Sequence, residues 1–505
     1  MPRFKAVDRQ PRFIPIDLQA QLVPGSFEFA LDYLIDQEID CAAIVARYRN
    51  DETGAPAYDP AVMLKIILLA YSRGMNSSRA IERACRENVL FMAISGDSAP
   101  QFTTIAKFIR ELETEITQLF TQVLMICQRQ GLIGGQMFAI DGVKLPSNAS
   151  KQRSGTHAEL AHEADRMEKA IKRIMQSHQG NDDVPLEIDE REQKQIRQLQ
   201  DEATRIRAFL AANKERKSEK GSLRKSNVTD NESAKMATSK GVIQGYTAVA
   251  AVDSQDQIIV AAHAHSSGSE QSILLPMIEQ TSQFRRPDTV ITADAGYHSE
   301  ANVKALFEQG IPALIADGLM RRRDERFKEQ DKYKQLPDPL WNKASPNVER
   351  KGLFRPSDFR HIIEENCAIC PAGKRLYSNG SQCTVNGRQH HKFTGAKRDC
   401  VPCNLRAQCL RTPDKTPVRQ VAIFHKNQAS PMRYTEAMKQ RIDSVEGRKQ
   451  YGRRLATVEP VFGNLRYNKK LDRFTLRGQK KVNTQWHLYC LVHNIEKLAH
   501  HRYAI

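Results

Sequence analysis

The chain has 505 residues, of which 40% are hydrophobic and 27% charged, and its net charge is +17. This length exceeds what one hydrophobic core normally organises, so we expect two to four domains. The basic balance favours a polyanionic partner, nucleic acid before an anionic membrane. An apolar signal region and a run of roughly 20 apolar residues are both missing, which argues against secretion and membrane insertion. We therefore expect a soluble, intracellular protein whose ten cysteines do not form a disulfide framework.

Residues 1–130 are predicted to form a helical N-terminal domain. Apolar residues recur at helical spacing in residues 58–92, where Asp59 and Pro60 suit a helix start, and again from Ile105 to Leu124, before Gly131 ends the run. The basic stretch SRGMNSSRAIERACR suggests a module that docks on DNA. By itself, such a stretch is more often a solvated helix face.

Residues 131–154 are predicted to begin a second, sheet-containing core. Met137 to Ile140 form an apolar, strand-like run, and Asp141 stands at its end. Residues 155–240 change character, because two charged helices flank the linker HQGNDDVP and are followed by a basic, Gly- and Ser-containing stretch. We expect a helical hairpin and then a mobile basic loop, in which Asp230 and Glu232 are solvated.

Residues 241–317 are predicted to complete that core. Apolar segments 246–252 and 258–264 flank a turn that begins at Asp253, which accounts for that carboxylate. A short helix near 270–279, a strand ending at Asp294, a helix at 299–309 and a strand at 311–316 follow. This order predicts an α/β fold, α+β overall, with a mixed sheet that carries helices.

Residues 318–430 are predicted to be a polar insertion that contains two Cys-x2-Cys units. The four predicted ligands are Cys367, Cys370, Cys400 and Cys403. Two such units supply four thiolates for tetrahedral Zn²⁺, and Cys409 is an alternative ligand. The competing interpretation is a small core with reduced cysteines. A structural Zn²⁺ would stabilise a segment too polar to fold alone.

Residues 431–505 are predicted to be helical and are the most basic part of the chain. From Arg433 to Lys481 there are 14 Lys and Arg residues against 5 Asp and Glu, a net charge of +9. Glu459 is conspicuous there as an acid. Pro460 follows it, so Glu459 is expected at a helix kink or a helix start.

Asp141 and Asp294 are candidate catalytic residues because each follows a strand of the same predicted sheet. Each alone is more often a turn or helix cap. Two adjacent carboxylates repel unless a cation or a proton lies between them, and oxygen ligands with open positions suit Mg²⁺ or Mn²⁺. Two such ions support in-line phosphoryl displacement, which usually needs a third carboxylate, and Glu459 is the candidate.

Cationic residues on both sides of Glu459 are candidate contacts for DNA phosphates. Arg466 lies seven residues beyond Glu459, about two turns, and would share its helix face if the helix continues. The full candidate set for DNA binding is Tyr451, Arg453, Arg454, Arg466, Lys469 and Lys470.

The motifs FAIDG, TADAGYHS and VEPVFGNLR, with RFTLRG and QWHLYCLVHNIEKL, resemble those of the DDE transposases of bacterial insertion sequences. YDPAVMLKIILLAY and PQFTTIAKFIREL also look like that family's helical N-terminal domain, so the resemblance covers most of the chain. Many relatives carry a C-terminal pattern of Tyr, Arg, Glu and Lys. In that pattern, three residues separate the Arg from the Glu, and six separate the Glu from the Lys. Here four residues separate Arg454 from Glu459, and Arg466 takes the place of the Lys.

The resemblance implies an RNase H-like core in which Asp141, Asp294 and Glu459 bind Mg²⁺ or Mn²⁺. It implies cleavage of double-stranded DNA at element ends and transfer of the 3′-hydroxyl to target DNA, by a homodimer on paired ends in the bacterial cytoplasm and nucleoid. Two other functions stay open: an RNase H-like nuclease without strand transfer, and a non-enzymatic, zinc-containing DNA-binding protein.

Overall fold

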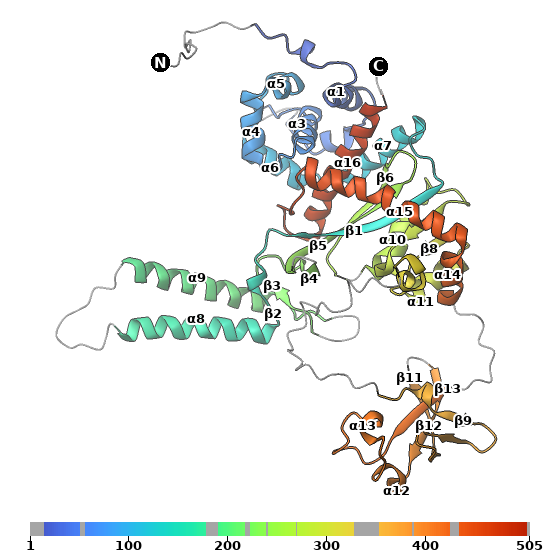
Figure 1. Ribbon diagram of the computed structural model, residues 1–505. Coiled ribbons are helices and arrows are strands. Elements are labelled where there is room, and N and C mark those ends of the chain that lie inside the picture. The colour runs from blue at the N-terminus through green and yellow to red at the C-terminus, as the bar shows by residue number, and fades with distance from the viewer. Residues whose placement is uncertain are drawn as a thin grey trace, which may run out of the picture. The chain divides into compact units, whose positions relative to one another are not determined.

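The computed structural model describes residues 15–50, 56–177, 190–217, 223–238, 241–268, 270–327, 353–385, 388–424 and 434–501. The chain forms two compact units, one made of Met1–Leu340 with Tyr434–Ile505 and the other of Trp341–Arg433. Figure 1 shows helices and strands mixed along the chain, so the predicted α/β class is confirmed. None of the described helices is long and apolar enough to cross a membrane.

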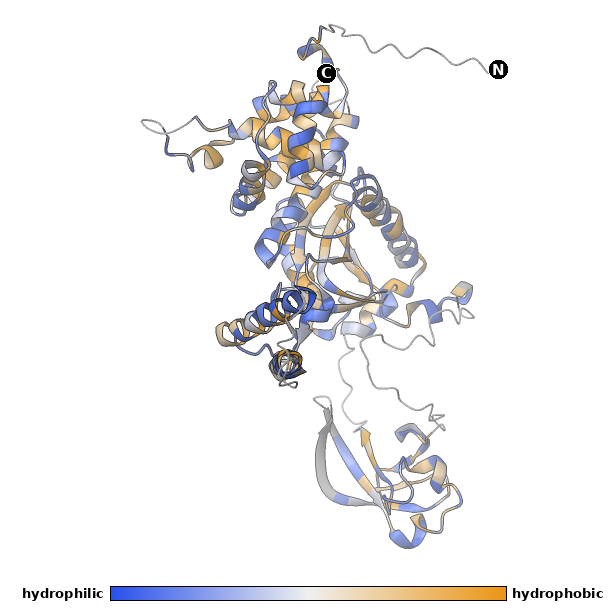
Figure 2. Ribbon diagram, turned by 90° about the vertical axis from the view of Figure 1, so that its left-hand side faces the viewer, coloured by the Kyte–Doolittle hydropathy of each residue, from blue (hydrophilic) through white to orange (hydrophobic). Residues whose placement is uncertain are grey.

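The N-terminal part of the first unit is a cluster of helices. They are α1 (Phe27–Gln37), α2 (Ala42–Val45), α3 (Pro60–Ser72), α4 (Ser78–Glu87), α5 (Val89–Ser95), α6 (Phe102–Glu111) and α7 (Ile116–Arg129). Helix α3 begins as predicted, because Asp59 caps it by accepting a hydrogen bond from the backbone N–H of Ala61 at 2.7 Å. Helix α3 is buried almost all round, and Figure 2 shows how apolar residues gather in this cluster and in the sheet.

A mixed sheet forms the centre of the first unit. Its strands are β1 (Met137–Pro146), β4 (Ala234–Thr238), β5 (Gly241–Asp253), β6 (Ile259–His265), β7 (Val290–Ala293) and β8 (Ala313–Ile315). The order is β4-β5-β1-β7-β8, with β6 also paired to β5. β5 is antiparallel to both β1 and β6. β1, β7 and β8 run parallel to one another. α10 (Leu274–Gln280) and α11 (Glu300–Glu308) connect the last strands.

The segment after β1 forms the predicted pair of helices. α8 (His157–Ser177) and α9 (Glu190–Ala212) lie side by side, and their bases join through β2 (Ser154–Gly155) and β3 (Ser226–Asn227). They pack through a narrow stripe that includes Leu160, Ala164 and Ile206, while most other positions are exposed.

The prediction of a mobile basic loop before β5 is wrong for residues 223–238. Strand β4 lies there and pairs with the first residues of β5, which buries Met236. Asp230 is also buried rather than solvated, since it accepts hydrogen bonds from the Tyr246 hydroxyl at 2.9 and 3.0 Å and from the Gly478 backbone N–H at 3.3 Å. Partners remote in sequence supply these contacts, so local composition could not reveal them.

The C-terminal helices pack back onto the sheet and the N-terminal helices. They are α14 (Tyr434–Asp443), α15 (Val445–Gly463), the π-helical turn Asn464–Asn468 and α16 (Gln479–His500). The Asn494 amide accepts a hydrogen bond from Ile259 N–H and donates one to Ile259 C=O, both at 2.9 Å. The Trp486 indole donates to Val249 C=O at 3.0 Å. Helix α16 is therefore fixed to β5 and β6 by buried polar contacts as well as by packing.

The second unit is a small antiparallel sheet with its own core. Its strands are β9 (Arg360–Ile362), β10 (Cys367–Ile369), β11 (Arg375–Val385), β12 (Arg388–Gly395) and β13 (Gln420–Phe424), in the order β13-β12-β11-β10-β9. Two short helices, α12 (Lys397–Cys400) and α13 (Arg406–Cys409), precede β13. Phe359, Leu376 and Phe393 are among its buried residues.

Replacing Asn494 by Ala should destabilise the first unit. It would leave the buried N–H and C=O of Ile259 without their side-chain partner, at a cost of about 1–3 kcal/mol for each group. We expect the melting temperature to fall by a few degrees, because the shift for each kcal/mol is about 2–4 °C at 150–250 residues and smaller in a larger unit. Asn468→Ala is the matched control, because Asn468 is exposed. Equal melting temperatures of the two variants would contradict this role of Asn494.

Candidate active site

Asp141 and Asp294 lie next to each other at one edge of the central sheet. β1 and β7 run parallel with Ile140 opposite Ala293, so the next residue of each strand is an aspartate. Asp141 lies inside β1, which continues to Pro146, and is not at the strand end as predicted. Asp294 directly follows β7 and accepts a hydrogen bond from Gly296 N–H at 2.9 Å. Burial and the neighbouring Asp141 raise the pKa of Asp294.

A third carboxylate, Glu270, belongs to the same cluster. Glu270 lies just before the 3-10 turn Gln271–Ile273, in the segment that follows β6. Burial, followed by the field of Asp294, raises its pKa to about 7, with Lys144 opposing and Asp141 adding to the shift. Lys144 is the cation of β1 that faces this cluster. Glu270 is therefore a site residue that the sequence interpretation missed.

Tyr297 carries its hydroxyl into this cluster. The side chain is fully buried, and its hydroxyl has no hydrogen-bond partner among the described residues. Burial, followed by the fields of Glu270, Asp141 and Asp294, raises the pKa of this hydroxyl well above its ordinary value. A Cβ atom on Gly142 would lie 3.2 Å from the hydroxyl oxygen, so the residue after Asp141 must be small.

Arg454 joins helix α15 to the first aspartate. Its Nη1 donates to Asp141 Oδ2 at 2.7 Å, and its guanidinium lies 5.7 Å from the centre of the Tyr451 ring. Burial lowers the pKa of Arg454, but Asp141 and Tyr451 outweigh it, and the net shift is upward. Residues 313 positions apart are thereby connected by a partly buried ion pair.

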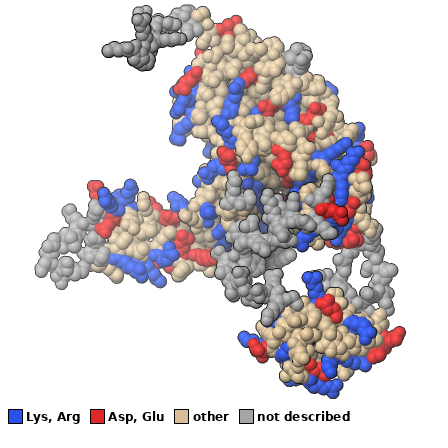
Figure 3. Space-filling view, viewed as in Figure 1, with Lys and Arg blue, Asp and Glu red and all other residues tan. Residues whose placement is uncertain are grey.

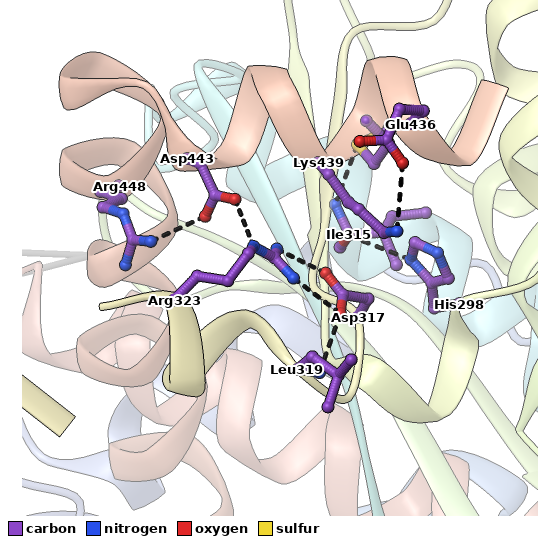
Figure 4. Close-up of polar contacts among 10 residues, drawn as sticks. His298, Ile315, Asp317, Leu319, Arg323, Glu436, Lys439, Asp443 and Arg448 are labelled. Atoms are coloured by element: carbon purple, nitrogen blue, oxygen red, sulfur yellow. Dashed lines mark hydrogen bonds and ion pairs between the residues drawn. The ribbon is translucent and has the colours of Figure 1, made fainter. Parts of the chain in front are cut away.

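A chain of ion pairs holds the start of α15 beside β8 (Figure 4). Arg323 donates to both oxygens of Asp317, at 3.0 and 2.6 Å, and to Asp443 at 2.5 Å. Arg448 donates to Asp443 and to Asp324, both at 2.7 Å. These bidentate and bridging contacts fix α14 and α15 relative to the end of β8, and so help to fix the position of Arg454.

Glu459 is not joined to the two aspartates by any contact between described residues. Helix α15 continues through Pro460, and Arg454, Val458 and Val461 are among its buried residues. Glu459 lies five residues after Arg454, roughly 140° around the helix axis, and is exposed beside Leu455. The extra residue between Arg454 and Glu459, noted in the sequence, places Val458 on the buried face at the position where three-residue spacing would put the acid.

The predicted DNA-binding residues fall into two groups. Arg453 and Lys470 are exposed, and Arg466 is partly buried. Arg454 contacts Asp141 and the Tyr451 ring within the site. Lys469 is buried, and its ammonium lies 2.6 Å from a Glu496 oxygen. The contacts of the second group are internal, and the charges of Arg454 and Lys469 are paired with Asp141 and Glu496. On the face seen in Figure 3, basic and acidic side chains are interspersed over both units.

The cysteines of the second unit are arranged differently from the predicted set. Cys370, Cys400, Cys403 and Cys409 line a common pocket, and Lys374 N–H donates to Cys370 Sγ at 3.3 Å. Cys367 is buried on β10 and is not among the lining residues. All described cysteines are free, and in the described parts of the chain no group of three or more Cys, His, Asp or Glu residues could hold a metal ion. The predicted Zn²⁺ site is therefore not supported.

The sequence did carry a weak signal for the missed residues. Tyr297 is three positions beyond Asp294, and Glu270 lies in a polar loop directly after an apolar strand. Loops that follow strands often line crevices, but only the strand order indicates which loops meet. Asp253 behaves as expected from its turn, because it accepts hydrogen bonds from Gly135 N–H and Gln255 N–H, both at 2.8 Å.

Two family models match the chain. A transposase DDE domain matches residues 369–499, and a transposase domain of the DUF772 type matches residues 16–111. The first match includes α15 and α16, and the second includes helices α1 to α6. No curated protein matches the chain. The two matches support the resemblance drawn from the sequence motifs at both ends of the chain.

Glu270→Gln should change how thermal stability depends on pH when divalent cations are removed with a chelator. The pKa of Glu270 is raised from 4.5 to about 7 in the folded protein, so its stabilising contribution is complete below pH 4.5 and is lost as pH rises through 7. The variant should melt close to the wild type at pH 5 and several degrees above it at pH 8. The exposed Glu279→Gln is the control and should show no such divergence. A constant difference between wild type and Glu270→Gln across this range would contradict the proximity of Glu270 to the aspartates.

Proposed function

We propose that this chain is an insertion-sequence DDE transposase that cuts DNA at element ends and transfers the 3′-hydroxyl to target DNA. The two matched segments support this proposal. The observation that carries the proposal is the pair Asp141 and Asp294 at the edge of a mixed sheet, with Arg454 of the matched C-terminal region bound to Asp141. Such a sheet, in which β5 is antiparallel to both β1 and β6 while β7 and β8 run parallel to β1, is consistent with an RNase H-like core.

The two neighbouring aspartates, Asp141 and Asp294, are ligands of the kind that suits a divalent cation, Mg²⁺ or Mn²⁺. The donors are carboxylate oxygens, which these cations prefer, and burial already disfavours the charge on Asp294. The unpartnered Tyr297 hydroxyl adds a buried polar atom beside them. When bound, the cation would supply charge stabilisation for phosphoryl transfer. Asp141 and Asp294 would hold it, and Glu459 is the third acid that the family resemblance implies.

The other parts of the chain have complementary roles in this proposal. The N-terminal helices, within the matched segment 16–111, would bind the terminal repeats, and exposed cations around α15 would contact DNA phosphates. Arg454 would keep α15 against the sheet through Asp141. Pairing of two DNA ends favours a homodimer, acting on DNA in the bacterial nucleoid.

Asp294→Ala should abolish Mg²⁺-dependent cleavage of element-end DNA and leave DNA binding unchanged, because it removes a carboxylate but no surface cation. Cleavage is measured on labelled end fragments and binding by electrophoretic mobility shift. Glu279→Ala is the control for the loss of an exposed acid. Cleavage by the Asp294→Ala variant at the wild-type rate would reject the assignment.

The products of the wild-type reaction separate transposition from simple nuclease activity. A transposase joins the liberated 3′ end to target DNA, whereas a nuclease leaves only nicked or cut fragments. Joined products are therefore expected in the presence of target DNA. Complete cleavage without joined products would favour the nuclease.

Lys470→Ala and Lys469→Ala should have different effects although the residues are adjacent. Lys470 is exposed, so its loss should weaken binding of all DNA sequences and lower the slope of log affinity against log salt by about 1. Lys469 is buried with Glu496, so its loss should lower stability by about 1–3 kcal/mol and leave the salt slope unchanged. Salt titrations of DNA binding, together with thermal melting, measure both effects. The reverse pattern would contradict the internal role of Lys469.

A further inference from the structure

The carboxylates of Glu270 and Asp294 both lie close to the Cα of Gly296. A Cβ atom built on Gly296 would lie 2.3 Å from Glu270 Oε2 and 3.0 Å from Asp294 Oδ1. Both oxygens are thus within contact distance of one point, and they can be no farther apart than the sum of these two distances. The absence of a side chain at residue 296 is what lets the two carboxylates approach.

The negative charge of this pair is not neutralised by direct contacts. Arg454 makes its ion pair with Asp141, and neither Glu270 nor Asp294 forms an ion pair with a described residue. Two carboxylates at such a distance repel each other strongly unless a cation or a proton lies between them. Glu270 and Asp294 are therefore the part of the cluster where positive charge is lacking.

A second observation at the same place indicates a ligand. The Tyr297 hydroxyl has no hydrogen-bond partner among the described residues, its side chain is fully buried, and its oxygen lies 3.2 Å from the position that a Cβ atom on Gly142, the residue after Asp141, would take. A buried hydroxyl left unpaired costs about 1–3 kcal/mol, so such groups normally have a partner. Water or another oxygen carried by a bound ion would supply that partner.

We propose that Glu270 is a third carboxylate of the divalent-cation site, which it forms with Asp294 and Asp141, and that the Tyr297 hydroxyl stabilises the filled site by hydrogen bonding. The inference rests on the proposed function, because it concerns the same site. It assigns cation affinity in the DNA-free protein to Glu270, which lies beside Asp294, rather than to the exposed Glu459. In the structure, Arg454 donates a hydrogen bond to one oxygen of Asp141, and the described carboxylates of Asp141, Glu270 and Asp294 do not surround one point.

The test is a titration of the full-length protein with Mn²⁺ in the absence of DNA. Electron paramagnetic resonance of the free Mn²⁺ ion measures how much of it is bound. We expect Glu270→Gln to weaken Mn²⁺ binding by about ten- to hundredfold, and Asp294→Asn to abolish it. Glu279→Gln, which removes an exposed acid from nearby α10, should bind as the wild type does.

Gly296→Ala provides an independent variant that keeps every carboxylate. The added methyl group must displace the Glu270 carboxylate, and the backbone at Gly296 is not left-handed, so alanine imposes no backbone strain. We expect a similar loss of Mn²⁺ affinity. Thermal melting of each variant under chelator identifies any that fails to fold.

The outcomes separate the inference from the proposed function. If Asp294→Asn loses Mn²⁺ binding but Glu270→Gln and Gly296→Ala keep wild-type affinity, the cation site stands and the role of Glu270 is overturned. A loss of affinity in Glu459→Gln with none in Glu270→Gln would make Glu459 the third ligand instead. Wild-type protein that binds no Mn²⁺, or an Asp294→Asn variant that binds it normally, would reject the metal site itself and with it the inference.

Discussion

Burial of α16 between the N-terminal helices and the sheet is the constraint on which the rest of the first unit depends. Its side chains are buried over nearly the whole length. Tyr489 packs on Tyr71 of α3 with ring centroids 4.8 Å apart, and His487 packs on Phe120 of α7 at 5.3 Å. On the opposite side, Trp486 and Asn494 bond to the backbone of β5 and β6. The apolar side chains of α16, such as Leu488, Leu491 and Val492, are buried on both sides, so this helix has to pack in the middle of the first unit.

The packing of α16 places the neighbouring helix α15 beside residues that lie more than 300 positions earlier in the chain. Phe462 of α15 stacks on Trp486 of α16 at 6.5 Å, and α15 then lies along the sheet with Arg454 against Asp141. The site is consequently assembled from four segments that are remote in sequence: β1, the segment after β6 that carries Glu270, β7 with its following turn, and α15. Its carboxylates are close, partly buried and under-neutralised, an arrangement that costs stability and that binding of a cation would relieve.

Much of the fold was predictable because it follows from local patterns. The helical spacing around Ile66 and Phe108, the Asp59 cap of α3 and the two apolar segments on either side of Asp253 each determine an element within one window. The proximity of the two aspartates was also predictable, because an acid directly after an apolar run is a recognisable local signal, although β1 in fact continues past Asp141 to Pro146. Prediction failed for β4 and for Asp230, since their burial comes from pairing with β5 and from Tyr246, contacts that a polar sequence window does not encode.

The sequence by itself determined the class of elements, the basic character of the C-terminal region, and the two aspartates with their resemblance to DDE transposases. Only the tertiary structure decided which charges meet. In the folded chain, Arg454 pairs with Asp141, and Lys469 pairs with Glu496. Glu459 lies on the exposed side of α15, whereas Glu270 and Tyr297 lie near Asp294. The physical reason is that helix phase and strand order, rather than residue type, set the distance between side chains, and electrostatic interactions depend on that distance.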